Sequence, residues 1–342
     1  MSEPIRLALI GAGLFVRDAH IPALVALSDR YRVIAVASRT LESAQARAAE
    51  FPYPVEATDN LPALLNRDDI EAIDVVLPIQ VQPPVLEMAL KSGKHVISEK
   101  PIARSVAEGQ QLIAQHTSGS QWTVAENFRY EAAYIRAAEL VAQGAIGRPL
   151  VANWTMYSPL NPGDKYYETP WRRAGDFPGG FLLDGGVHWV AAFRLILGEI
   201  VRVSGFAALT REDTPPLNAL TANFEFASGC IANYSALFGA APGGDYSTGL
   251  TISSSEGLMQ VLSDRVTITQ GSETHSFKVS GADSVQAELA AFADSLRDGK
   301  LHRNSPQQAL QDTAVIEALL QSADSGQAER VALFANKSSD SK

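Results

Sequence analysis

Apolar segments of two kinds alternate along the first 125 residues. Short runs such as Ile5–Ile10, Tyr31–Ala37 and Ile73–Leu77 are typical of buried strands, and longer segments with helical spacing, including 14–27 and 41–51, follow them. The connections between the segments are short. Regular alternation of strand and helix predicts an α/β fold with a doubly wound parallel sheet.

The pattern changes in the second part of the chain. Residues 201–279 contain several alternating segments with turn signals such as Ser228-Gly229 between them, and no helical pattern separates these strands. Consecutive strands of this kind predict a mostly antiparallel sheet. Helical spacing returns over 182–197, 285–296 and 306–321.

A chain of 342 residues is longer than one hydrophobic core usually organises. We therefore predict two domains and a polar C-terminal tail. The predicted divisions are a parallel-sheet domain over 1–125, an α/β domain over 126–335 and a disordered tail over 336–342.

Composition excludes several classes of function. The net charge of −10 argues against nucleic acid as the main partner, because such proteins need a basic surface. A single cysteine, Cys230, allows no internal disulfide and no cysteine metal cluster, so we expect no metal. No signal peptide or apolar run of about 18 residues is apparent, which leads us to expect a cytoplasmic protein with no membrane partner.

Gly11-Ala-Gly13 lies between the first predicted strand and the first predicted helix. Glycines at this position permit a tight turn, and they let backbone N–H groups approach a pyrophosphate. Val16 stands where the usual fingerprint has its third glycine. A plain strand–helix connection would also use glycines, but the strand–turn–helix context favours dinucleotide binding.

The end of the second predicted strand indicates which dinucleotide binds. Enzymes that use NAD commonly have an acidic residue here, whereas this chain has Ser38-Arg39-Thr40. An arginine and two hydroxyls suit a 2′-phosphate, so we predict NADP as the preferred cofactor, with NAD possible as well. The alternative is that Thr40 caps the next helix and Arg39 is solvated.

Glu99-Lys100-Pro101 follows another predicted strand, which contains Val96 and Ile97. Ligands bind outside the carboxyl ends of strands in an open parallel sheet, so Lys100 lies where chemistry is expected. The alternative is a surface Lys–Glu pair in a loop, which is common and contributes little.

A third group of residues begins with Gly179-Gly180 and continues to Asp184 and His188. On a continuous helix, Asp184 and His188 would share one face because four positions separate them. A histidine beside a carboxylate can act as a general base near neutral pH. Such a pair can also be an ordinary hydrogen bond on a helix surface.

Taken together, these three motifs resemble those of the Gfo/Idh/MocA oxidoreductases, the group of glucose–fructose oxidoreductase and inositol dehydrogenase. The resemblance covers about residues 5–335. It implies an N-terminal Rossmann domain and a C-terminal α/β domain with a large open sheet. In this family that sheet often forms the oligomer interface, so we expect a homodimer or homotetramer. The chain is most similar to a subgroup that uses NADPH.

The resemblance also implies roles for individual residues. Lys100, Asp184 and His188 fall on the catalytic positions. The expected cofactor-binding residues are Gly11, Gly13, Leu14, Phe15, Ser38, Arg39, Thr40, Leu77, Pro78, Glu99, Lys100 and Asn127. The expected substrate residues are Lys100, Asn127, Arg129, Tyr157, Trp171, Arg172, Asp184 and His188. His20 has two interpretations, a position near the cofactor or a role in helix packing, and we favour helix packing. Asp74 lies within a buried strand pattern, and we assign no function to it.

These inferences predict an NADP(H)-dependent oxidoreductase acting on a C–OH/C=O group of a sugar, polyol or related carbonyl compound. His188 would accept the hydroxyl proton, Lys100 would stabilise the alkoxide, and Asp184 would orient the substrate or His188. Two alternatives remain open: a non-catalytic dinucleotide-binding regulator on the same scaffold, and a reductase of small non-sugar aldehydes.

Overall fold

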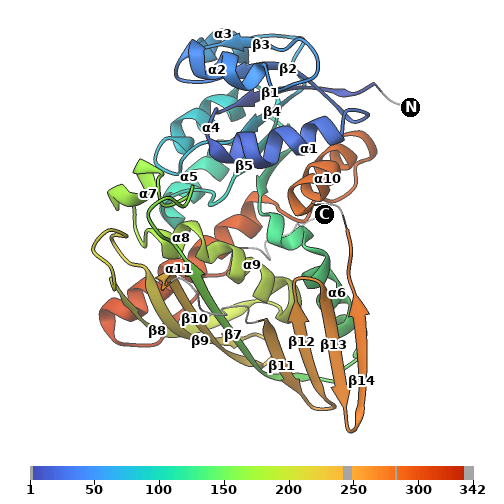
Figure 1. Cartoon of the computed structure of the whole chain (residues 1–342), viewed down its shortest axis with the longest axis vertical. Helices are drawn as coiled ribbons and strands as arrows, with labels where there is room; N and C mark the ends of the chain where they lie inside the picture. The colour runs from blue at the N-terminus through green and yellow to red at the C-terminus, as the bar shows by residue number, and fades with distance from the viewer. Residues whose placement is uncertain (1–2, 242–248, 282, 335–342) are drawn as a thin grey trace. The chain divides into compact units, whose positions relative to one another are not determined.

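The computed structural model describes residues 3–241, 249–281 and 283–334, and the chain divides into two compact units (Figure 1). The first unit comprises Met1–Asn127 and Ala282–Leu310, and the second comprises Phe128–Gly281 and Gln311–Lys342. The predicted disordered tail over 336–342 lies outside the described residues.

The first unit is built on a parallel sheet of six strands in the order β3-β2-β1-β4-β5-β6. The strands are β1 (Ile5–Ile10), β2 (Tyr31–Ala37), β3 (Glu56–Thr58), β4 (Ala72–Val75), β5 (His95–Glu99) and β6 (Trp122–Ala125). The order reverses between β1 and β4, which is the arrangement of a doubly wound Rossmann sheet. The predicted fold of this part is confirmed.

Helices connect these strands. They are η1 (Val16–His20), α1 (Ile21–Ala26), α2 (Leu41–Ala48), α3 (Leu61–Leu65), α4 (Gln82–Lys91) and α5 (Val106–Gln115). The helical segment predicted over 14–27 contains a π-helical turn, η1, which begins at Val16. Turns of this kind are frequent at functional sites.

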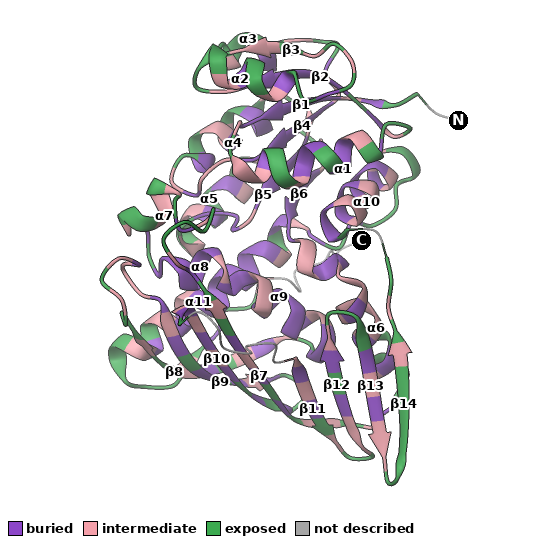
Figure 2. Ribbon diagram, in the orientation of Figure 1, coloured by how far each residue is buried: buried purple, intermediate pink, exposed green. Residues whose placement is uncertain are grey.

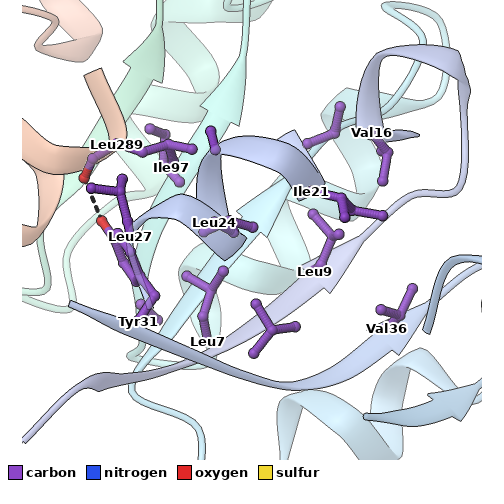
Figure 3. Close-up of a cluster of buried hydrophobic side chains, with 14 of the residues drawn as sticks. Leu7, Leu9, Val16, Ile21, Leu24, Leu27, Tyr31, Val36, Ile97 and Leu289 are labelled. Carbon is purple, nitrogen blue, oxygen red and sulfur yellow. Dashed lines mark hydrogen bonds between the residues drawn. The ribbon is translucent and has the colours of Figure 1, made fainter. Parts of the chain in front are cut away.

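The first unit also contains α10 (Ser284–Asp298), which comes from late in the sequence. Its apolar side chains, including Leu289 and Phe292, join the core formed by Leu7, Leu24 and their neighbours (Figure 3). The Tyr31 hydroxyl donates a hydrogen bond of 2.6 Å to the Leu289 carbonyl. The compact units therefore differ from the predicted uninterrupted domain over 126–335, because the apolar face of α10 is buried in the first core.

The second unit contains a sheet of nine strands in the order β14-β13-β12-β11-β7-β10-β9-β8-β15. The strands are β7 (Pro149–Pro159), β8 (Ile200–Ala208), β9 (Ala219–Phe226), β10 (Ile231–Ala240), β11 (Leu250–Ser254), β12 (Leu258–Leu262), β13 (Arg265–Gln270), β14 (Glu273–Lys278) and β15 (Glu329–Arg330). Among the described strand pairs of this nine-stranded sheet, only β7 and β10 pair in parallel. The predicted large, mostly antiparallel sheet is confirmed.

Helices cover one face of this sheet. In α9 (Gly186–Leu197), Phe193 packs against Trp154 of β7 and Phe224 of β9, with ring centroids 5.1 and 5.4 Å apart. Buried and exposed residues alternate along β9 and β10, so the opposite face is open (Figure 2). The unit's other helical segments are η2 (Asn127–Tyr130), α6 (Ala132–Ala142), α7 (Pro170–Ala174), α8 (Phe181–Asp184) and α11 (Pro306–Ser325), of which η2 and α11 contain the points of division.

Two local differences from the predicted elements affect the site. The helix predicted over 182–197 is divided at Gly185 into α8 and α9, so Asp184 ends one helix and His188 lies in the first turn of the next. The segment 158–180, over which the sequence predicts no helix, contains the short helix α7, whose first residue is Pro170. Among the described residues, no helix is long and apolar enough to cross a membrane.

Candidate active site

The carboxyl ends of β1 and β4 lie side by side, and their loops carry several of the predicted cofactor residues. The two strands pair in parallel, with Ile10 opposite Val75. Gly11 follows β1, and Leu77 and Pro78 follow β4. A reversal of strand order opens a crevice at this edge, which is where dinucleotides bind in such sheets.

The two glycines after β1 meet different surroundings. A Cβ added to Gly11 would lie 2.2 Å from the carbonyl oxygen of Val76, and Gly11 has a φ of +134°. Gly11 is therefore required for close packing against the neighbouring strand. A Cβ added to Gly13 would meet no atom within 4 Å, and Gly13 is exposed. Gly13 therefore leaves space for a ligand at the start of the helical segment, and this fits a dinucleotide.

The end of β2 supports both interpretations of Ser38-Arg39-Thr40. The Thr40 hydroxyl accepts a hydrogen bond of 3.3 Å from the Ser43 backbone N–H, which makes Thr40 the N-cap of α2. Arg39 is exposed beside it, whereas Ser38 is half-buried. The cap explains Thr40 structurally, and the exposed cation at the strand end is compatible with a phosphate.

Lys100 follows directly after β5, as the sequence predicts, and its backbone is held on both sides. The Lys100 N–H donates to Oε2 of Glu99 at 3.2 Å. The Gln82 side-chain amide donates to the carbonyl oxygens of Glu99 at 2.7 Å and Pro101 at 3.2 Å. Because Gln82 is fully buried at the start of α4, the chain around Lys100 is anchored to a rigid element.

A buried group of polar side chains lies behind Lys100. His20 Nδ1 is 2.7 Å from Oδ2 of Asp74, and His20 Nε2 is 3.0 Å from Oε1 of Glu99. Burial alone would lower the pKa of His20, but the Asp74 and Glu99 carboxylates and their hydrogen bonds raise it to about 10. Burial raises the pKa of the Asp74 carboxyl more than His20 lowers it. The sequence does not predict this cluster, because its signal is limited to polar residues at positions whose neighbours are apolar.

The second unit brings together Asp184 and the loop that precedes it. Arg172 Nε donates to Oδ2 of Asp184 at 2.7 Å. The Arg172 guanidinium lies over the rings of Trp171 and Tyr166, at 4.0 and 5.0 Å from their centroids. A buried carboxylate paired with an arginine beside two aromatic rings can bind a polyhydroxylated ligand through both hydrogen bonds and ring faces.

His188 is half-buried in an aromatic environment. Its ring stacks on Phe128, with centroids 4.5 Å apart and an interplanar angle of 20°. Trp189 packs edge-on against the same Phe128 ring at 5.4 Å and against Phe238 at 6.2 Å. Stacking on Phe128 fixes the plane of the imidazole ring. A group that accepts a proton in a defined direction needs such a fixed orientation.

Three further predicted site residues have other surroundings. Asn127 donates from its side chain to the Ser284 hydroxyl of α10 at 2.8 Å. Arg129 is buried and donates to both oxygens of Asp312, at 2.7 and 2.8 Å. Tyr157 is exposed, and three positions along β7 separate it from Trp154, which packs against Phe193 of α9. Tyr157 therefore lies on the open face of the nine-stranded sheet. The structure therefore separates Tyr157 from α9, because side chains alternate between the two faces of a strand.

Within residues 3–241, 249–281 and 283–334, no group of three or more His, Cys, Asp or Glu side chains could hold a metal ion.

Comparisons with known proteins identify the family. The profile described as "Oxidoreductase family, NAD-binding Rossmann fold" matches residues 5–126, and the profile of the Gfo/Idh/MocA C-terminal domain matches residues 134–260. Dehydrogenase FPY6 of Fusarium mangiferae is 32% identical, with 93% of this chain and 96% of that protein covered. A dTDP-3,4-didehydro-2,6-dideoxy-alpha-D-glucose 3-reductase of Streptomyces violaceoruber is 35% identical over 61% of this chain and 59% of that protein.

A solved structure agrees with these matches over almost the whole length. The crystal structure of an oxidoreductase from Thermotoga maritima superposes with a TM-score of 0.87 at 36% identity, covering 94% of this chain and 97% of that one. The chain belongs to the Gfo/Idh/MocA oxidoreductase family. It is an NAD(P)-dependent oxidoreductase of the type that acts on CH–OH or C=O groups.

Proposed function

We propose that this protein transfers a hydride between NADP(H) and a C–OH/C=O group of a sugar, a polyol or a related carbonyl compound. The position of Lys100 carries the proposal, because it follows a Rossmann strand directly and is anchored by Glu99 and Gln82. The reductase of Streptomyces violaceoruber, which is named for a sugar nucleotide, supports a sugar-like substrate. The Arg172–Asp184 pair beside Trp171 and Tyr166 supports the same class.

The cofactor would be held by the loops at the carboxyl edge of the parallel sheet. They contain Gly11, Gly13, Leu14 and Phe15 after β1, Ser38, Arg39 and Thr40 after β2, Leu77 and Pro78 after β4, and Glu99, Lys100 and Asn127 at the ends of β5 and β6. When bound, the nicotinamide supplies the hydride acceptor or donor. The open space at Gly13 supports binding of a dinucleotide, and the exposed cation of Arg39 supports NADP as the preferred form.

The protein's own side chains would move the proton and stabilise charge. In the oxidative direction, His188 accepts the proton of the substrate hydroxyl, and the Lys100 ammonium stabilises the developing alkoxide. Asp184, fixed by Arg172, orients the substrate or His188. Trp171 and Arg172 are the remaining substrate contacts that we propose, since Arg129 is committed to Asp312 and Tyr157 lies on the open sheet face.

A substrate panel tests this proposal. NADPH absorbance would be followed with aldoses, ketoses, inositols, lactones and simple aldehydes. In Lys100→Ala we expect the rate with the best substrate to fall by at least ~10²-fold, the usual scale for a positioned acid–base group, while NADPH affinity is kept. Lys91→Ala is the matched control, because Lys91 is exposed and pairs only with Glu87 in the same helix turn among its described contacts. Near-full turnover in Lys100→Ala, or tight NADPH binding without turnover of any compound, contradicts the proposal.

Cofactor preference has its own test. We expect Arg39→Ala to reduce the preference for NADP over NAD by roughly tenfold, which corresponds to about 1.4 kcal/mol. Wild-type protein that favours NAD tenfold, or an unchanged preference in the variant, would show that Arg39 does not select the 2′-phosphate.

We also propose self-association, as a homodimer or homotetramer, through the open face of the nine-stranded sheet. Val151, Ile231 and Phe206 are exposed on this face, Phe206 to 79%. Light scattering after size-exclusion chromatography should give a dimer or tetramer mass, and Phe206→Lys should shift it toward the monomer. A monomeric wild-type protein would refute this.

A further inference from the structure

The geometry around His20 determines how many protons the cluster of His20, Asp74 and Glu99 needs for its hydrogen bonds. Each ring nitrogen of His20 faces a carboxylate oxygen, Nδ1 facing Asp74 and Nε2 facing Glu99. Ionised carboxylates only accept hydrogen bonds, so each of the two contacts needs a proton. An imidazolium between two carboxylates supplies both protons from the ring and leaves the cluster with one net negative charge.

The surroundings of His20 favour this charge state. Carboxyls from three elements act on the ring: Asp74 of β4, Glu99 of β5 and Glu288 of α10. Glu126, which follows β6, and Tyr31 of β2 lie close enough to interact with these carboxyls. Phe15 covers the ring edge-on at 5.3 Å, and the His20 side chain is only 1% exposed, so the ring is shielded from water. A buried positive charge is stabilised by opposite charges at hydrogen-bond distance.

Glu99 connects this cluster to Lys100. One oxygen of its carboxylate, Oε1, faces His20, and the other, Oε2, accepts the hydrogen bond of the Lys100 backbone N–H. The Glu99 carboxylate is therefore held at one oxygen by the imidazole ring and at the other by the residue that we propose as catalytic. Without His20, Glu99 would keep a buried charge with one fewer donor and would be able to turn away from Lys100.

We propose that His20 is a positioning residue: as an imidazolium clamped between Asp74 and Glu99, it fixes the Glu99 carboxylate on the backbone of Lys100 and so sets the direction of the lysine side chain. Asp74 holds the other ring nitrogen, Nδ1, and so keeps the plane of the ring. Neither His20 nor Asp74 needs to touch substrate or cofactor. The role rests on the proposed function of Lys100, but the clamp itself can be tested without turnover.

Two substitutions separate positioning from general packing. The side-chain nitrogen of glutamine reaches about as far as Nε2 of histidine, and that of asparagine about as far as Nδ1. We expect His20→Gln to keep the donor to Glu99 and to retain kcat within about threefold. We expect His20→Asn to lose it and to lower kcat by about 10- to 100-fold, the scale of small misplacements of a reacting group, while substrate KM and NADPH Kd change less than threefold. His116→Gln is the matched control, since it replaces another histidine of the first unit that contacts Trp122 and Ser120.

The kinetic outcomes are unambiguous for folded variants. Equal losses in His20→Gln and His20→Asn, or no loss in either, would overturn the positioning role. If Lys100→Ala keeps full activity, the proposed function of Lys100 fails, whatever the His20 variants do.

Nuclear magnetic resonance tests the clamp independently of activity. In wild-type protein labelled with 15N at histidine, both ring nitrogens of His20 should carry a proton at pH 8. The backbone amide of Lys100 should exchange slowly with solvent, and it should exchange at least tenfold faster in His20→Asn than in His20→Gln. One bare ring nitrogen at pH 8, or equal exchange rates in two folded variants, would refute the clamp.

Discussion

Each compact unit buries a charged side chain between two side chains of the opposite charge, and the charge at the centre is positive in one unit and negative in the other. In the first unit, His20 lies between the carboxyls of Asp74 and Glu99. In the second unit, the carboxylate of Asp312 in α11 lies between the guanidinium groups of Arg129 and Arg194. Side chains in both clusters are almost completely excluded from solvent, with Asp312 exposed to only 2% and His20 to 1%.

The difference between the clusters lies in their cationic groups. Arginine keeps its charge at any pH that a protein tolerates, so the cluster around Asp312 has a fixed charge on both flanks. A histidine between carboxylates exchanges protons within the range over which proteins are studied. The fixed cluster joins η2, α9 and α11 within one unit, whereas the titratable cluster lies next to the proposed catalytic lysine. In the second unit the buried charges therefore join three helical segments. In the first unit, as we propose, the buried charge positions the Lys100 side chain.

Asp312→Asn should produce the largest loss of stability, because it leaves two buried guanidinium groups without their shared carboxylate. We expect the free energy of unfolding to fall by about 3–5 kcal/mol. Urea unfolding followed by the fluorescence of Trp154 and Trp189, which lie in the same unit, measures the loss.

Glu139→Gln is the control for that measurement. Glu139 pairs with Arg136 within α6, and the two side chains are 51% and 33% exposed. Its loss should cost less than about 1 kcal/mol. A similar cost for the two substitutions would mean that burial does not distinguish these ion pairs.

Raising the pH should weaken only the cluster of the first unit. The pKa of His20 is about 10 in the folded protein and 6.5 without its partners. Its raised pKa therefore contributes stability fully below pH 6.5, and this contribution is lost as the pH rises toward 10. Between these values the stability advantage of wild type over His20→Asn should shrink by up to about 1.4 kcal/mol per pH unit.

Denaturant titrations at several pH values would measure this slope. The advantage of wild type over Asp312→Asn should stay constant over the same range, because arginine does not titrate there. A flat profile for His20→Asn would mean that the histidine is neutral in the folded state.

Glu288→Gln should have the smallest effect, although it removes a fully buried carboxyl in the same unit as His20. Burial, with help from Glu99 and Glu126, raises the pKa of Glu288 well above its usual value, and this shift favours the neutral acid. Its Oε1 accepts a hydrogen bond of 2.6 Å from Asn304, and an amide oxygen can accept the same bond. The free energy of unfolding at pH 7 should change by less than about 1 kcal/mol. A loss comparable to that of Asp312→Asn would show that Glu288 is ionised.

Much of the architecture could be predicted because local patterns carry it. The strands Ile5–Ile10 and Tyr31–Ala37 have the predicted bounds, and Lys100 directly follows the predicted strand that contains Val96 and Ile97. The apolar face of 284–298 was recognisable as a helix face, but its packing in the first core was not. Helical periodicity indicates that a face is buried without indicating which core buries it.

Some features of the candidate site could also be predicted from the sequence, and others could not. Sequence spacing could place Asp184 and His188 near each other, but not the break at Gly185 that puts them in two helices. The side to which Tyr157 points depends on strand register, since one residue of shift exchanges the faces. His20 contacts partners 54 and 79 residues away, and nothing local marks them as partners.

The sequence by itself determined the order of strands and helices, the glycine turn, the lysine after the fifth strand and the family. These properties depend on neighbouring residues, whose preferences act within a turn or a strand. Only the tertiary structure decided that α10 completes the first core, that Asp312 is shared by two arginines, and that Asp74, His20 and Glu99 form one buried cluster. Such contacts arise when the sheet and its helices close together, because a buried charge takes its partner from whatever chain segment the fold brings within hydrogen-bond distance.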